Sequence, residues 1–160
     1  MSRIEDLIKE GLSEDGTILN LRDKFIGLRG TMELMTKEDA LKNVKTFVYS
    51  NNQIADEGAE AIARCKFLPN LEVLTLNHNE IGDEGAVLLA KTPYLPKVSH
   101  LSLFGNVIGD EGAQAFADSE TSKKYVKLDL YKNQFTREGI KALTESPNLK
   151  NCEELEIYRE

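Results

Sequence analysis

The sequence is poor in the residues that build cross-linked or membrane-bound proteins, with two cysteines, four prolines and no tryptophan in 160 residues. Cys65 and Cys152 are too few for a disulfide framework, so we expect reduced thiols in a cytoplasmic protein. No apolar run approaches the roughly 18 residues of a membrane-spanning helix, and the N-terminal stretch lacks the continuous apolar segment of a signal peptide. These absences predict a soluble protein that does not bind a membrane.

Basic residues are also in the minority, with 20 Lys and Arg against 27 Asp and Glu and a formal net charge of −7. Proteins bind nucleic acid through basic patches that neutralise phosphate, so this balance argues against a nucleic-acid partner. Hydrophobic residues make up 41% and charged residues 29%, which is typical of a folded domain. The length predicts one domain.

An internal repeat is the main feature of the sequence. Asn52, Asn79, Asn106 and Asn133 each follow the previous one by 27 residues (79 − 52, 106 − 79 and 133 − 106). A spacing kept over four copies without an insertion indicates a repeat protein. The copies read YSNNQIADEGAEAIA from Tyr49, LNHNEIGDEGAVLLA from Leu76, LFGNVIGDEGAQAFA from Leu103 and, more weakly, LYKNQFTREGIKALT from Leu130.

Each copy predicts one strand followed by one helix. Leu74 and Leu76 alternate with polar residues, which is typical of a strand with one buried face, and Ala86 and Leu89 then share one face of a helix. A unit of this size cannot bury both apolar faces alone, so neighbouring units must stack with their strands parallel. We expect the repeated asparagines to bond backbone groups of adjacent turns, forming a ladder; the alternative is a solvated turn residue.

Acidic residues and a glycine mark the start of each predicted helix. Asp56, Asp83 and Asp110 are each followed by a glutamate, and carboxylates at this end interact favourably with the helix dipole. We expect the glycine two residues later, for example Gly85, to permit close packing of the helix on the sheet.

The pattern LxxLxLxxNxIGDEGAxxLA resembles the leucine-rich repeat, specifically the ribonuclease-inhibitor-like subfamily that includes Ran GTPase-activating proteins. The resemblance covers about residues 41–160. It implies an α/β fold: a right-handed solenoid with a parallel sheet on its concave face, helices on its convex face and a protein partner bound on the concave side. In one copy it is carried by Leu71, Leu74, Leu76, Asn79, Ile81, Gly85 and Leu89.

We expect the whole chain to form one leucine-rich-repeat domain with an N-terminal cap. Ser2 and Glu5 form a capping-box pattern, and Ile4, Leu7 and Ile8 follow helical spacing. The alternative is an amphipathic helix that binds a partner. The predicted segments are a capping helix in residues 1–16, a degenerate repeat in 17–40, repeats in 41–67, 68–94, 95–121 and 122–148, and a truncated final repeat in 149–160.

The degenerate first repeat has Lys24 where the later repeats have the ladder asparagine, 28 residues before Asn52 (52 − 24). Thr36 and Asp39 are a candidate local helix cap. Four apolar residues are predicted to supply the helical part of this repeat: Met32, Leu34, Met35 and Leu41.

At the other end, Cys152, Leu155 and Ile157 predict a last strand that no helix follows. Such an end exposes an unpaired strand edge. Three explanations stay open: the chain tolerates the edge, it was cut from a longer one, or two chains meet end to end as a homodimer. Five nearby charges are predicted to protect the edge: Glu153, Glu154, Glu156, Arg159 and Glu160.

Outward-facing strand residues are predicted to form columns, because equivalent positions of adjacent strands lie about 4.8 Å apart. One column runs from Asn77 to Phe104, Tyr131 and Tyr158. Solvent-facing aromatic residues are enriched at binding hot spots, so we predict that this stripe contacts a partner. The alternative is that a C-terminal extension or a shifted register buries it.

Two carboxylates, Asp129 and Glu156, occupy neighbouring strands beside the aromatic column. They could form an acidic patch that receives a basic side chain of the partner, or an ordinary solvated surface together with Lys127 and Lys132. A catalytic role would need a pocket and a third group, which the sequence does not indicate.

His78 and His100 are further candidates for partner binding on the concave side. About five residues separate them along the strand direction, roughly 16 Å at 3.3 Å per residue, which is too far for a catalytic dyad or a shared metal. Cys65 and Cys152 are interpreted as packed thiols. With no P-loop, GxGxxG, HExxH or CxxC pattern either, we expect no enzyme, no metal and no cofactor.

These observations favour a non-enzymatic module that binds a protein partner through the concave face. One alternative is a regulator of a small GTPase. It rests on the resemblance to Ran activators alone, and the chain has about half the repeats we would expect of such an activator. Another alternative is a structural element that assembles with itself.

Overall fold

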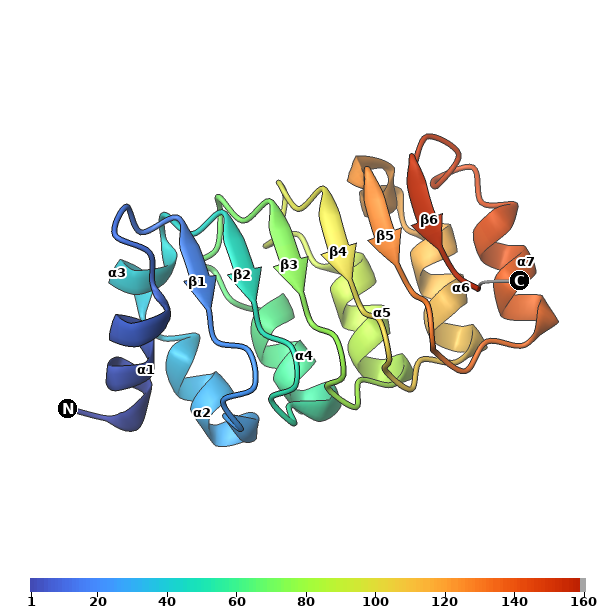
Figure 1. The fold of residues 1–160 in the computed structure, drawn as a ribbon. Coiled ribbons are helices and arrows are strands. Elements are labelled where there is room, and N and C mark those ends of the chain that lie inside the picture. The colour runs from blue at the N-terminus through green and yellow to red at the C-terminus, as the bar shows by residue number, and fades with distance from the viewer. Residues whose placement is uncertain (159–160) are drawn as a thin grey trace.

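Six short strands form one parallel sheet in the order in which they occur along the chain (Figure 1). The computed structural model describes residues 1–158. The strands are β1 (Ile18–Asn20), β2 (Thr46–Val48), β3 (Val73–Thr75), β4 (His100–Ser102), β5 (Lys127–Asp129) and β6 (Glu154–Glu156); the helices are α1 (Arg3–Gly11), α2 (Gly27–Leu34), α3 (Glu38–Leu41), α4 (Ala55–Ala63), α5 (Asp83–Lys91), α6 (Asp110–Asp118) and α7 (Arg137–Thr144), with a 3-10 turn η1 (Glu120–Lys124).

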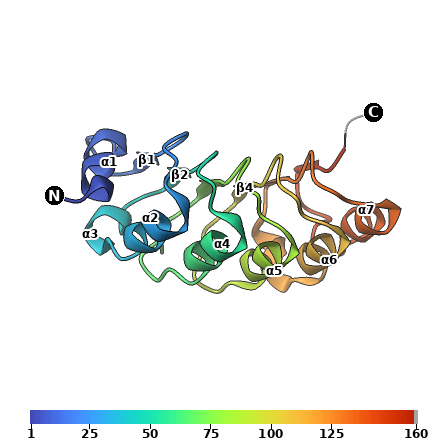
Figure 2. The same ribbon diagram turned by 90° about the horizontal axis from the view of Figure 1, so that it is seen from below.

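The helices that follow the strands lie on one side of the sheet, and each packs beside the helix of the next repeat (Figure 2). The result is an arc of alternating strands and helices, which confirms the predicted leucine-rich-repeat architecture. None of the helices in residues 1–158 is both long enough and apolar enough to cross a bilayer.

The register of the strands aligns equivalent residues of successive repeats. Leu74 of β3 pairs with Phe47 of β2 on one side and with Leu101 of β4 on the other. These central strand residues are buried, and so are those two positions further on, such as Leu76 and Leu103. The period-two pattern therefore points one row into the core and leaves the alternate residues on the open face.

The side chains of the repeated asparagines bond backbone groups of two repeats. The Asn79 side-chain oxygen accepts a hydrogen bond from the Asn52 amide (2.8 Å), and its Nδ2 donates to the Tyr49 carbonyl (3.0 Å). The Asn106 oxygen in turn accepts from the Asn79 and Ile81 amides (2.9 and 3.0 Å). A buried amide side chain is thus satisfied by backbone groups that would otherwise lack partners.

The degenerate first repeat takes part in this ladder without an asparagine of its own. The backbone amides of Lys24 and Ile26 donate to the Asn52 oxygen (3.1 and 3.3 Å). The first repeat contributes only backbone amides to the ladder. The asparagine that accepts from them belongs to the second repeat. At the other end, Asn133 accepts from the Ile108 amide (3.0 Å).

A second set of bonds, here called the aspartate bridges, links the helix starts. The Asp56 carboxylate accepts hydrogen bonds from the amides of Gly82 (2.7 Å) and Gly85 (3.0 Å) in the next repeat. Asp83 accepts in the same way from the amides of Gly109 and Gly112, and Asp110 accepts from the amide and the hydroxyl of Thr136. The expectation that these aspartates act on their own helix was therefore incomplete. Each carboxylate accepts hydrogen bonds from backbone amides at the start of the following helix, which would otherwise have no partner within that helix.

The glycines at the starts of α5, α6 and α7 (Gly85, Gly112 and Gly139) make room for the neighbouring repeat and not for the sheet, which corrects our expectation; a Cβ on Gly58 would meet only Ile54 of its own repeat. A Cβ on Gly85 would lie 2.7 Å from the Asp56 carboxylate and 3.0 Å from the Ala59 side chain. The missing side chain therefore allows the bridge and the close approach of α4 and α5.

The N-terminal helix α1 begins with the expected capping box. The Ser2 hydroxyl accepts from the Glu5 amide (3.2 Å), and the Glu5 carboxylate accepts from the Ser2 amide (2.9 Å). Ile4 is buried, and the segment after α1 pairs with β1 through a bridge between Leu12 and Leu19. The helix thus packs at the β1 end of the sheet.

One prediction about the first repeat was wrong. The Thr36 hydroxyl donates to the Glu33 carbonyl (2.7 Å) and does not cap α3, which begins after Lys37. Met32 is 57% exposed, because it lies on the outer side of α2, whereas Leu34 reaches the core.

β6 is the outermost strand at the C-terminal end of the described sheet. Ile157 belongs to the buried row, with only 7% of its surface exposed, and Glu154 forms an ion pair with Lys127 (3.4 Å). Arg159 and Glu160 lie outside the described residues. The end-to-end homodimer stays a prediction.

We predict that Asn79→Ala lowers the free energy of unfolding by about 2–4 kcal/mol, because it leaves the buried Asn52 amide without its partner and removes one of the two hydrogen bonds to the Tyr49 carbonyl. Urea denaturation followed by circular dichroism measures the change. The matched control is Asn43→Ala at an exposed position, with an expected change below about 0.5 kcal/mol. Equal losses in the two variants would contradict the ladder.

The Asp110 bridge predicts a pH effect. The Thr136 hydroxyl and amide bond the Asp110 carboxylate and hold its pKa below the ordinary value of 3.8. Because the folded state has the lower pKa, the bridge stabilises the fold above pH 3.8, and this contribution is lost as pH falls through the lowered pKa. We predict that Thr136→Val raises the pKa of Asp110, as measured by carbon NMR titration. Exposed Thr144→Val is the control, and identical titrations of wild type and Thr136→Val would sink the idea.

Candidate functional site

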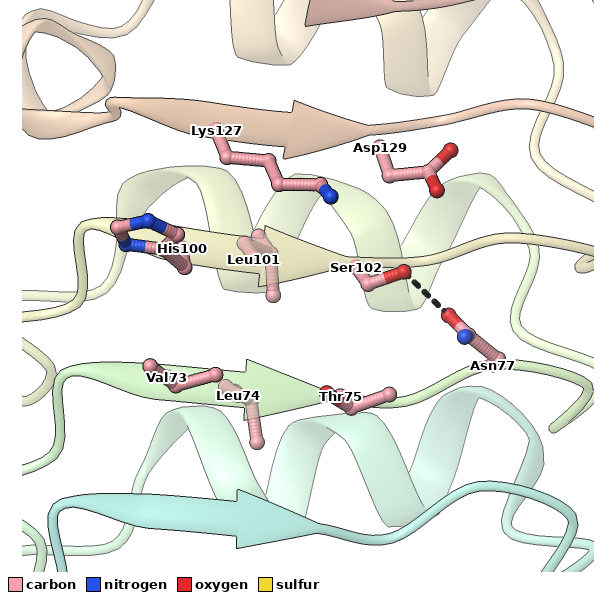
Figure 3. Close-up of a pocket in the computed structure, with 9 residues that line it drawn as sticks. All are labelled: Val73, Leu74, Thr75, Asn77, His100, Leu101, Ser102, Lys127 and Asp129. Carbon is pink, nitrogen blue, oxygen red and sulfur yellow. Dashed lines mark hydrogen bonds between the residues drawn. The ribbon is translucent and has the colours of Figure 1, made fainter. Parts of the chain in front are cut away.

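The open face of the sheet holds a hollow of about 370 Å³ over β3, β4 and β5 (Figure 3). The short side chains of Val73, Thr75 and Ser102 lie beside the longer side chain of Lys127 (Figure 3). The residues that line it are Val73, Leu74, Thr75, Asn77, His100, Leu101, Ser102, Lys127 and Asp129.

Charged and titratable groups lie at both ends of the hollow. His100 and Lys127 are neighbours in the register at the amino ends of their strands, and Asp129 lies at the carboxyl end of β5 (Figure 3). The Asp129 carboxylate accepts a hydrogen bond from the Tyr131 amide (3.0 Å). One bound segment could therefore meet the His100 ring at one end of the hollow and the Asp129 carboxylate at the other.

Asn77, which lines the hollow, connects the chain after β3 to β4 and to the turn after it. Its side-chain oxygen accepts hydrogen bonds from the Ser102 hydroxyl (2.6 Å) and the Phe104 amide (3.0 Å). These bonds fix the end of β3 to the turn after β4. Asn77 thereby positions Phe104.

Beside the hollow lies a row of three rings, His78, Phe104 and Tyr131, here called the aromatic row. The His78 and Phe104 ring centroids are 5.1 Å apart and nearly perpendicular, and those of Phe104 and Tyr131 are 5.6 Å apart. The Lys132 ammonium lies 5.8 Å from the Phe104 ring centre. Phe104 and Tyr131 are half-buried rather than fully exposed as expected, while Tyr158 is 53% exposed.

The turn after each strand places His78 in this row. Asn51, His78, Gly105 and Lys132 occupy the same repeat position and all have φ between 54° and 72°. Such a conformation is uncommon for residues with a side chain. A Cβ on Gly105 would lie 2.3 Å from the His78 ring, so the glycine leaves the space that the imidazole fills.

The remaining candidates have different neighbours. Asp129 and Glu156 are register partners on β5 and β6. The His100 ring lies beside the Ser99 hydroxyl (2.9 Å) at the amino end of β4, whereas His78 lies in the turn after β3 and contacts Phe104 in the turn after β4. Within residues 1–158, the structure contains no cluster of three or more His, Cys, Asp or Glu that could hold a metal ion.

Both cysteine side chains are directed to backbone carbonyls. The Cys65 thiol donates to the Met35 carbonyl (3.5 Å) and the Cys152 thiol to the Val126 carbonyl (3.5 Å). Burial raises the pKa of both thiols, which disfavours the reactive thiolate.

Thr75, Ser102 and Lys127 line the hollow but are not singled out by the sequence. The sequence indicates only that these three residues belong to outward-facing columns of the repeat. It does not indicate that they surround a hollow. Small or isolated polar residues on a strand look like ordinary surface until neighbouring strands form a hollow around them.

A sequence model of the leucine-rich repeat matches residues 43–63, 67–90 and 94–117. No curated protein is similar enough in sequence to count as a match. The matched segments and the arc of strands and helices agree in giving this chain a leucine-rich-repeat fold.

Solved structures give a finer comparison. The C-terminal domain of a tropomodulin from Caenorhabditis elegans aligns with a TM-score of 0.65 and 16% identity, over 94% of this chain and 93% of that domain. Actin-Binding Site 2 of leiomodin-1 aligns with a TM-score of 0.57 and 19% identity, over 92% of this chain and 86% of that one. At this identity the likeness concerns the fold. The resemblance to Ran activators in particular stays a prediction.

We predict that Gly105→Ala destabilises the protein more than Gly16→Ala does. Both glycines have φ above 70°, but nothing lies within 4 Å of a Cβ on Gly16, whereas one on Gly105 meets His78. Backbone strain of about 1–2 kcal/mol is common to both variants, and overpacking adds at least about 1 kcal/mol at Gly105. Thermal and urea unfolding measure the difference. Adding His78→Ala should remove the excess; if the excess persists, the ring is not what the glycine accommodates.

Proposed function

We propose that this chain is a protein-binding module whose concave sheet face holds a segment of a partner protein. The aromatic row beside the open hollow is the observation that supports this most. Aromatic residues provide large contact areas at little cost in side-chain entropy, and they are enriched among residues that dominate binding energies.

The open face changes in chemistry along the arc, which supports one orientation of the partner. On β2 and β3 the outward residues are uncharged, as with Val48, Val73 and Thr75, whereas on β5 and β6 they include Asp129 and Glu156. The two carboxylates lie near the aromatic row, and the nearby Lys127 is already paired with Glu154. The fitting partner segment is apolar at its β2 end and carries an aromatic or aliphatic anchor and a basic side chain at its β5 end.

Actin is the first partner to test. The leiomodin-1 domain that shares this fold is named an actin-binding site. Co-sedimentation with filamentous actin and fluorescence titration of monomeric actin would measure binding directly. Binding that is absent at high micromolar concentration in both assays removes actin but leaves the concave surface to other partners.

Regulation of a small GTPase is the second candidate, and the resemblance to Ran activators is what favours it. A single-turnover GTP hydrolysis assay separates the two: an activator accelerates hydrolysis at catalytic amounts, whereas a binding module leaves the rate unchanged.

We predict that Phe104→Ala and Tyr131→Ala each weaken partner binding about 10- to 100-fold, the size expected for aromatic hot spots, and leave the fold intact. Affinity capture from native lysate with wild type and each variant identifies the partner, and titration calorimetry then measures its affinity.

Gln114→Ala on the outer side of α6 is the matched control and should bind like wild type. Circular dichroism reports whether the variants fold. A captured partner that tolerates both aromatic substitutions would contradict concave binding, and unfolding of Tyr131→Ala would mean that this ring belongs to the core.

A further inference from the structure

Helix α2 carries an apolar surface on its solvent side. Leu28 is 39% and Met32 57% exposed, and because they are four residues apart they share one face of the helix. Phe25, in the turn that leads into the helix, is 63% exposed. Single exposed apolar residues are ordinary, but Leu28 and Met32 lie one turn apart on the same helix and line one groove together.

The other repeats supply an internal reference for these positions. The 28-residue offset between Lys24 and Asn52 aligns α2 with α4, and the 27-residue period extends the alignment. At the position of Leu28, none of the later repeats has an apolar residue. At the positions of Phe25 and of Met32, one later repeat has a valine and the others have polar or charged residues. Equivalent to Phe25 are Gln53, Glu80, Val107 and Gln134; to Leu28, Asp56, Asp83, Asp110 and Arg137; to Met32, Glu60, Val87, Gln114 and Lys141.

The substitution at Leu28 also changes how two helices meet. Leu28 stands where the next three repeats have the aspartate of the aspartate bridges, so α2 provides no such bridge to α4. Between the two helices lies an open groove of about 430 Å³. It is lined by Leu28, Met32, Glu57, Glu60, Ala61 and Arg64.

The groove carries a net negative charge. Glu60 is paired with Arg64 (2.9 Å), whereas Glu57 forms no ion pair with any residue of the described chain. Two carboxylates against one guanidinium leave one negative charge beside an apolar floor. A cationic group next to an apolar surface is the complement.

We propose that the α2–α4 groove binds an amphipathic helix of a partner protein, with apolar residues at positions i, i+3 or i+4, and i+7 and a Lys or Arg directed at Glu57. A groove between two adjacent helices accepts a third helix whose side chains fill it. α2 and α4 have eight and nine residues, about 12–14 Å at 1.5 Å per residue, which matches two to three turns of the bound helix.

This surface is separate from the concave one. The helices lie on one side of the sheet (Figures 1 and 2), and the hollow is on its other, open side, so both surfaces can be occupied at once. The inference does not depend on the proposed function, and a failure of either leaves the other standing.

The test uses a phage-displayed library of 14-residue helical peptides, with apolar residues fixed at positions 1, 4, 8 and 11 and the others varied. Selection on the full chain should enrich peptides with Lys or Arg beside the apolar face. Fluorescence anisotropy with a selected peptide should show at least a tenfold loss of affinity for Met32→Glu and for Leu28→Asp, which introduces the residue of the later repeats.

Gln114→Glu, at the position of Met32 on α6, is the matched control and should bind the peptide like wild type, as should Phe104→Ala. Glu57→Lys should reverse the preference toward peptides with Asp or Glu. Circular dichroism confirms that each variant is folded.

Three results would overturn the proposal: no enrichment on wild type over Met32→Glu, peptide affinity that is unchanged in both groove variants, or enriched peptides with no basic preference. Light scattering tests whether a second copy of the chain occupies the groove. A wild-type dimer that Met32→Glu converts to a monomer would show that a second copy, and not a partner helix, covers the groove.

Discussion

The stacking of repeats depends on the ladder of buried asparagine side chains. Where the chain leaves each strand it must turn sharply, and the turn exposes backbone amides and carbonyls that neither strand nor helix can satisfy. Asn79 and Asn106 bond these groups in their own repeat and in the preceding one. Each turn is therefore completed only by its neighbour, which fixes the register of the strands and aligns the outward columns on which any binding surface is built.

The aspartate bridges perform the same task in the helical layer. Asp56 and Asp83 satisfy the first amides of the following helix, and the glycines beside them let neighbouring helices approach closely. The asparagine ladder thus aligns successive repeats in the sheet layer, and the aspartate bridges align them in the helical layer. The pair α2 and α4 is linked only by the asparagine ladder, because Leu28 replaces the aspartate, and this is where the helical layer opens into a groove.

The two candidate surfaces arise from departures from the repeat. On the concave side, Phe104 and Tyr131 replace the polar Asn77 of the earlier repeat, and Gly105 gives His78 room to join them. On the convex side, Leu28 and Met32 replace polar or charged residues of most later repeats. Residues that recur in every repeat stabilise the arc. Residues that differ between repeats form the two surfaces on which we propose that partners bind.

The sequence by itself determined the period, the burial of Leu74 and Leu76, the parallel stacking and the columns, because these follow from residue type and spacing within one repeat. Only the tertiary structure decided that Asp56 reaches Gly82, that Met32 faces solvent and that Phe104 is half-buried between His78 and Tyr131. The physical reason is that Asp56 and Gly82, and likewise Phe104 and its two ring neighbours, are 26 or 27 positions apart and become neighbours only when the repeats have stacked, while the exposure of Met32 depends on how α2 packs on the sheet.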